Sequence, residues 1–116
     1  MGKVTSVSPL APSKFPDLPV IEGVQFATAC AGVKYQGRTD VMLATLAPGT
    51  TIAGTFTRSA TRAAPVLDCQ AKIGGASDQG AAILVNSGNA NAFTGRGGVT
   101  AVEAITKAVS ATCNVP

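Results

Sequence analysis

Residues 81–113 read AAILVNSGNANAFTGRGGVTAVEAITKAVSATC, and the fold follows from this stretch because it joins a strand pattern to a helix pattern. The run AAILV at 81–85 is apolar throughout and is bounded by Gly80 and Asn86, which predicts a strand buried on both faces. Thr100 and Glu103 have the T-x-x-E spacing of a capping box at a helix N-terminus. Apolar residues then recur at helical spacing and predict a helix that ends near Asn114, namely Val99, Val102, Ile105, Val109 and Cys113.

Strand patterns also precede this stretch. Residues 24–28 alternate apolar and polar side chains as a half-buried strand does, and residues 32–35 continue the pattern beyond a bend. Residues 40–47 and 51–57 flank the turn signal PG at 48–49, which predicts that these two segments pair as an antiparallel hairpin. Gly54 within the second segment indicates a bulge or a close backbone approach.

A second helix is expected over residues 63–73, with Pro65 in its first turn and GG at 74–75 as its stop. Strands and helices that mix without strict alternation indicate a mixed α/β (α+β) architecture. Residues 8–19 contain four of the seven prolines and therefore favour an extended segment. We accordingly expect an extended proline-rich arm over residues 1–19 and a partial α/β domain over residues 20–116.

Composition excludes several classes of chemistry. The sequence has no histidine, which rules out within these residues a Ser-His-Asp or Cys-His nucleophile and an HExxH zinc site. The six carboxylates have no i,i+3 or i,i+4 spacing, so no local acid/base pair or calcium loop is expected, and no metal site is predicted. Cys30, Cys69 and Cys113 lie far apart in sequence and are interpreted as buried thiols of a reducing compartment.

Charge and hydropathy give the expected location. The nine Lys and Arg residues produce a net charge of +3 but never form a run of three, so nucleic-acid binding is not expected. No apolar run approaches the ~20 residues that a membrane-spanning helix needs, and a secretory h-region is lacking near Met1. The sequence therefore predicts a soluble, cytoplasmic protein without a membrane partner.

The segment between the predicted buried strand and the last helix is the candidate site. Ligands of sheet-and-helix proteins gather beyond strand ends, where loops lead into helices, and amide and hydroxyl side chains concentrate here. The candidate site-supporting residues are Asn86, Ser87, Gly88, Asn89, Asn91 and Thr94. The alternative is a purely architectural Asn/Gly turn whose amides satisfy neighbouring backbone groups.

Other features of the sequence give weaker support for a functional site. The run GRGG at 95–98 lies too far from the strand for a dinucleotide-binding fingerprint, and Thr100 occupies the third glycine position. Arg38 and Asp40 lie in a turn before a strand, which favours solvated or capping roles. Arg58 and Arg62 could attract a carboxylate substrate, although surface arginines are the commoner explanation.

Taken together, the motifs resemble the ornithine acetyltransferase family of arginine biosynthesis, from about Pro9 to Pro116. The motifs, in order, are GVKY at 32–35, GRTD at 37–40, AGTFTR at 53–58, AAPV at 63–66 and VNSGNANAFTG at 85–95. The resemblance implies transfer of acetyl from N-acetylornithine to glutamate, with acetyl-CoA a further substrate in some members and with no cofactor. It also implies a core of two packed β-sheets flanked by helices.

The resemblance further implies a precursor that cuts itself before an internal threonine. The resulting α and β chains stay together as an α2β2 assembly, and the freed threonine forms an acetyl-threonine intermediate with its own amine as base. The family's oxyanion-hole, substrate-binding and cleavage positions have no counterpart in these residues, so no catalytic residue is assigned. We therefore interpret the chain as the N-terminal part of the α chain and expect it to be inactive alone.

The sequence is also compatible with two other functions. One is a related self-processing aminopeptidase, because fold alone does not fix function. Release of an N-terminal residue from a peptide without acetyl transfer would distinguish it. The other is a non-catalytic scaffold. The turn signal NVP at 114–116 follows a predicted helix end, which leads us to expect further elements beyond it.

Overall fold

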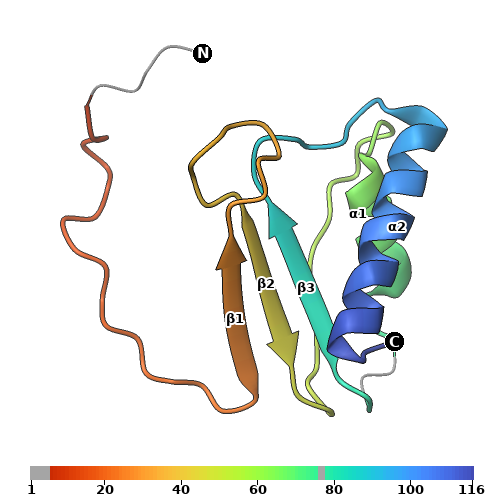
Figure 1. Ribbon diagram of the computed structural model, residues 1–116, viewed down its shortest axis with the longest axis horizontal. Coiled ribbons are helices and arrows are strands. Elements are labelled where there is room, and N and C mark those ends of the chain that lie inside the picture. The colour runs from red at the N-terminus through yellow and green to blue at the C-terminus, as the bar shows by residue number, and fades with distance from the viewer. Residues whose placement is uncertain (1–5, 76–77) are drawn as a thin grey trace.

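The computed structural model describes residues 6–75 and 78–116, so the part of the predicted arm at residues 1–5 lies outside the described residues. The order of elements is β1 (Val24–Ala29), β2 (Val41–Leu46), α1 (Ala64–Lys72), β3 (Ala81–Asn86) and α2 (Gly95–Cys113). Both helices and an antiparallel sheet are therefore present, which confirms the mixed α/β class. Residues 6–21 form no helix or strand and are exposed, and they run apart from the sheet (Figure 1).

The three strands form one antiparallel sheet in the order β1-β2-β3. The register places Ala44 of β2 between Phe26 of β1 and Ile83 of β3. Ala44 is 5% exposed and is the one buried apolar residue among residues 6–75 and 78–116. The small methyl group suits this central position, where a larger side chain on each neighbouring strand flanks it.

The helices lie together on the β3 side of the sheet (Figure 1). α1 contacts α2, and α2 contacts β3. Pro65 lies in the first turn of α1, as predicted, where its missing N–H costs no hydrogen bond. α2 ends at Cys113 and is capped by Asn114, whose left-handed φ of 54° is a conformation that asparagine tolerates at a helix end.

The predicted hairpin between residues 40–47 and 51–57 is wrong. β2 hydrogen-bonds to β1 along one edge and to β3 along the other, which leaves no edge for another strand. Residues 51–57 form no strand, and Gly54 lies instead beside Ile73, directly after α1, where an added Cβ would be 3.0 Å from Ile73 Cδ1. Residues 32–35 likewise form no strand, because they belong to the connection from β1 to β2.

The prediction that β3 is buried on both faces is also wrong for this chain. Ile83 and Leu84 lie on opposite faces of the sheet, since successive residues of a strand alternate, and they are 40% and 38% exposed. Among the described residues β3 is an edge strand that pairs with β2, and the helices approach it mainly through α2. Its apolar character therefore exceeds what the described residues cover.

The cysteines were predicted as buried thiols, and the structure contradicts this. Cys30 and Cys69 are exposed, and Cys113 is half-buried. Cys30 directly follows the edge strand β1, and Cys69 lies on a helix that packs mainly against α2, so neither position is enclosed.

Candidate functional site

The direction of the strands brings two connections to one edge of the sheet. β1 and β3 both run antiparallel to β2, so the ends of β1 and β3 lie beside the start of β2. The 31–39 loop, which joins β1 to β2, and the 87–94 segment, which joins β3 to α2, therefore emerge at the same edge (Figure 1). The six candidate residues lie at the end of β3 or in the segment that leads from this edge to α2.

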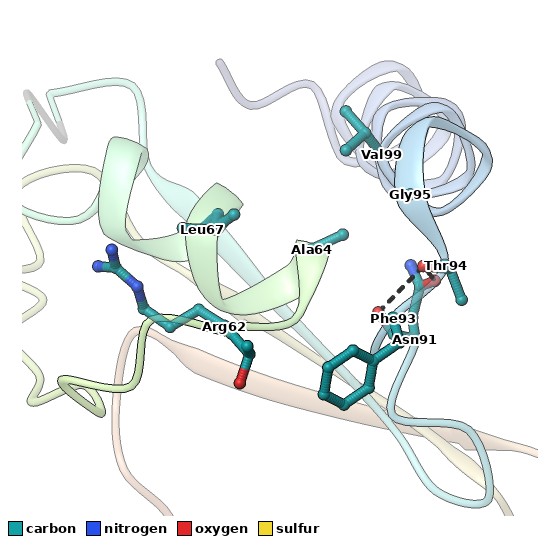
Figure 2. Close-up of a pocket in the computed structure, with 9 residues that line it drawn as sticks. Arg62, Ala64, Leu67, Asn91, Phe93, Thr94, Gly95 and Val99 are labelled. Carbon is teal, nitrogen blue, oxygen red and sulfur yellow. Dashed lines mark hydrogen bonds between the residues drawn. The ribbon is translucent and has the colours of Figure 1, made fainter.

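Hydrogen bonds within the 87–94 segment and its flanks fix its shape. Asn86 Nδ2 donates to the Asn89 carbonyl at 3.0 Å, and Asn89 Oδ1 accepts from the Asn91 N–H at 2.8 Å. Asn91 Nδ2 donates to the carbonyl of Gly98 at 2.9 Å, while Thr94 Oγ1 donates to Asn91 Oδ1 at 2.6 Å. Figure 2 shows the Asn91 and Thr94 side chains directed at each other at the start of α2. The amides thus support the loop and the helix start together.

This network corrects the predicted start of the last helix. α2 begins at Gly95, after Thr94, and Thr100 and Glu103 lie inside the helix, so they form no capping box. Gly98 is buried, and a Cβ there would overlap Thr94 Oγ1 and lie 2.6 Å from Asn91 Oδ1. The glycines at 95, 97 and 98 thus lie inside α2 although glycine lowers helix propensity. At Gly98 the missing side chain makes room for the Asn91 and Thr94 side chains.

Five of the six candidate residues line one of two clefts or face the 31–39 loop. Asn86 and Ser87 line a cleft of about 180 Å³ together with Thr39, Asp40 and strand residues of β2 and β3. Gly88 faces the 31–39 loop, where an added Cβ would lie 2.8 Å from Lys34 Cβ. Asn91 and Thr94 line a second cleft, and Asn89 lines neither.

The second cleft lies between the N-terminal ends of α1 and α2 and has a volume of about 310 Å³. Phe93 stands at its mouth with 88% of its surface exposed and with a φ of 57°, which is rare for a bulky residue. Arg62 also lines this cleft, but Nη1 donates to Gln70 Oε1 at 3.0 Å, and Figure 2 shows its guanidinium directed away from Phe93. The cleft is therefore mainly apolar.

Asp40 is the residue whose importance the sequence patterns understated. Its side chain is 5% exposed, so the solvated role is wrong, whereas the capping role agrees with the structure. Oδ1 accepts from the Ala31 N–H at 2.6 Å and Oδ2 accepts from the Val33 N–H at 2.7 Å. These hydrogen bonds, with that to Ala31 the strongest, hold the pKa of the Asp40 carboxyl below its ordinary value, although burial opposes them.

Two cationic side chains of the 31–39 loop lie beside an aromatic ring of the same loop. Lys34 Nζ and the Arg38 guanidinium lie 5.4 and 5.0 Å from the centre of the Tyr35 ring, within cation–π range.

Among residues 6–75 and 78–116, no three His, Cys, Asp or Glu side chains gather as a metal site would require. No helix in that same part of the chain has the length and apolar character needed to cross a bilayer.

Comparison with known proteins identifies the family. The model of the ArgJ family matches residues 25–116. The arginine biosynthesis bifunctional protein ArgJ of Ruegeria pomeroyi is 70% identical over all 116 residues, which cover 28% of that protein. The proteins of the same name from Nitrobacter winogradskyi and Agrobacterium fabrum are 58% identical over 96 residues and 49% identical over 106 residues.

Those two alignments cover 81% and 91% of this chain but 23% and 25% of the relatives. The chain thus spans about a quarter of the length of the curated relatives it matches. No solved structure matches it. Since the family model covers most of the sequence and the identity extends over its whole length, the chain belongs to the ArgJ family.

Proposed function

We propose that this chain is the N-terminal part of the α chain of a bifunctional ornithine acetyltransferase and glutamate N-acetyltransferase. The observation that carries the proposal is the 70% identity, over all 116 residues, to a relative named as an arginine biosynthesis bifunctional protein. The family match over residues 25–116 supports it independently of the arm. The share of the relatives that is matched agrees with a partial chain.

In the proposed reaction, a threonine downstream of these residues attacks the acetyl carbonyl of N-acetylornithine through its hydroxyl oxygen. The hydroxyl proton passes to the threonine's own α-amine, and ornithine leaves with a proton on its amine as the acetyl-threonine ester forms. The amine of glutamate then attacks this ester, which releases N-acetylglutamate and restores the threonine. A reaction of this kind needs no cofactor, and acetyl-CoA is a possible alternative acetyl donor.

The role we assign to the present residues is support. Hydrogen bonds join four side chains to one another's residues and to α2, namely those of Asn86, Asn89, Asn91 and Thr94. Such bonds are expected of groups that fix a wall of the site. Residues held by such bonds lose little conformational freedom when a ligand arrives. We therefore propose that the segment supports the site from beside it.

The proposal extends to assembly and location. We propose that the α chain stays associated with a β chain from the same precursor in an α2β2 assembly in the cytoplasm, and that the core contains two packed sheets. The exposed apolar residues on both faces of β3 support the presence of further covering structure. Native mass spectrometry of the full-length product tests the subunit composition.

The test of the function is an assay of the full-length gene product. After intact mass has confirmed self-cleavage, incubation with N-acetylornithine and glutamate should yield N-acetylglutamate and ornithine in equal amounts. The matched control replaces the newly exposed threonine by alanine in a co-expressed pair of separate chains. A correctly cleaved wild-type protein that makes no N-acetylglutamate contradicts the proposal, and peptide trimming instead would favour an aminopeptidase.

A further inference from the structure

Asp40 lies at the edge of the sheet where the 31–39 loop and the 87–94 segment meet. Its carboxylate accepts the Ala31 and Val33 N–H groups, which closes the 31–39 loop upon itself. Its own N–H donates to the Ala29 carbonyl at 3.1 Å, which joins the end of β1 to the start of β2. Three separate hydrogen bonds at one buried residue therefore determine where this loop lies.

The same residue reaches the 87–94 segment. The Ser87 N–H donates to the Asp40 carbonyl at 2.8 Å, directly after β3. One residue further along, Gly88 has a φ of 100° and lies so close to the loop that a Cβ would come within 2.8 Å of Lys34 Cβ. A shift of the loop would therefore move the carbonyl that the Ser87 N–H binds, and the missing side chain of Gly88 is what lets the loop lie this close.

We propose that Asp40 is a positioning residue, which holds the 31–39 loop against Ser87 and Gly88 and so fixes the 87–94 segment in the shape that the acetyltransferase site requires. The functional half of this inference rests on the proposed function, whereas the structural coupling does not. The carboxylate acts through the loop and the segment and does not itself touch substrate.

The test uses full-length protein carrying Asp40→Asn, which keeps the shape but turns one acceptor into a donor facing an N–H group. Asp17→Asn, on the exposed arm, is the matched control. Amide hydrogen exchange in Asp40→Asn should be about tenfold faster or more at residues 31–33 and at 87–94, with α1 unchanged, because one hydrogen bond is lost and the other no longer has a charged acceptor. The kcat/KM for N-acetylglutamate formation should fall by up to about a hundredfold, as expected when reacting groups are displaced.

A merely structural role gives a different result. Faster exchange confined to residues 31–33, or spread equally over α1, overturns the inference, as does an unchanged kcat/KM in an active enzyme. If the wild-type protein makes no N-acetylglutamate, the proposed function fails, while the exchange pattern still decides the coupling.

A second variant approaches the same contact from the other side. Gly88→Ala should push Lys34 away and speed exchange at residues 31–33, although position 88 is distant from them in sequence. Combined with Asp40→Asn, its effect on exchange at 87–94 should be less than additive, because both changes break one contact. Unchanged exchange at 31–33 in Gly88→Ala, or strict additivity, would reject the coupling, and this variant decides the matter if Asp40→Asn does not fold.

Discussion

At the scale of single residues, the Asp40 carboxylate accepts two backbone N–H groups at 2.6 and 2.7 Å, which makes the local structure sensitive to acid. Its pKa is lowered in the folded protein relative to an ordinary aspartate near 3.9, so the charged form favours folding. The contribution to stability is complete above the unfolded pKa and is lost as the pH falls through the lower, folded pKa.

Thermal unfolding of full-length wild type and Asp40→Asn tests this sign. The difference between their unfolding midpoints should be constant from pH 7 to about pH 5 and should shrink below about pH 4, where aspartate becomes protonated. A difference that grows in acid would mean that Asp40 is not held as a carboxylate.

Two neighbouring glycines of α2 offer a matched comparison at the same scale. An added Cβ at Gly98 would overlap Thr94 Oγ1, whereas one at Gly97 would meet nothing within 4 Å. Gly98→Ala should therefore lower the free energy of unfolding by about 1–3 kcal/mol, as overpacking does. Gly97→Ala should raise it by about 0.5–1 kcal/mol, because alanine is the better helix former.

Denaturant unfolding of both variants in the full-length protein provides the measurement. Equal effects of the two substitutions would show that the start of α2 is packed differently from the structure described above.

At the scale of elements, the start of α2 separates two readings of the same sequence. The T-x-x-E spacing indicates a start near Thr100, but the structure begins the helix at Gly95 and ties it to Asn91. Asn91→Ala should cost about 1–2 kcal/mol of unfolding free energy, because a helix-terminal side chain and its hydrogen bonds are lost. Thr100→Ala, inside the helix, should instead be neutral or stabilise by up to about 0.7 kcal/mol.

Urea titrations of the two alanine variants distinguish these starts. A loss of about 1 kcal/mol in Thr100→Ala, as for a removed cap, would restore the capping-box interpretation.

Local sequence patterns predicted most helices and strands, and they failed where pairing with distant strands determines the structure. Apolar alternation at 24–28, the run at 81–85 and the period of Val99, Val102 and Ile105 all correspond to observed elements. The hairpin prediction failed because residues 51–57 alternate like a strand, while β2 has already paired with β1 and β3. Aspartate at the end of a glycine-containing loop was the available signal for the β1-β2 connection, since such carboxylates bind backbone N–H groups.

The place of the 87–94 segment between β3 and α2 was predictable, but its hydrogen bonds were not. Composition and the position after a predicted strand singled out three asparagines, and the structure places Asn86 at the end of β3 and Asn89 and Asn91 beyond it. The pairing of Asn91 with Thr94 and Gly98 depends on left-handed backbone at Asn91 and Phe93, which no spacing rule specifies. The contribution of Asp40 was understated because burial of a carboxylate follows from tertiary structure.

At the scale of the whole molecule, the described residues leave many large apolar side chains exposed to solvent. Phe26, Ile83, Leu84 and Val85 are 68%, 40%, 38% and 48% exposed, and Ile83 and Leu84 face opposite sides of the sheet. Exposed patches of this kind are typical of surfaces that other structure covers. The 116-residue polypeptide prepared alone should therefore bind the dye ANS strongly, whereas the full-length protein should bind little.

ANS fluorescence at equal molar concentration is the measurement, and acetyl transfer by the isolated polypeptide should be undetectable in the same samples. A polypeptide as inert to the dye as the full-length protein would show that its strand faces need no cover.

The antiparallel order of the three strands also places their connections at two opposite ends of the sheet, here called rims. The 31–39 loop and the 87–94 segment share one rim, while the turn at residues 48–49 lies at the opposite one, where the Thr50 N–H and hydroxyl both close upon the Ala47 carbonyl. Lengthening that distant turn by a few glycines would therefore leave the asparagine network untouched. An evolutionary lineage, or an engineer adding a fluorescent tag, has freedom at the 48–49 rim that it lacks at Asp40.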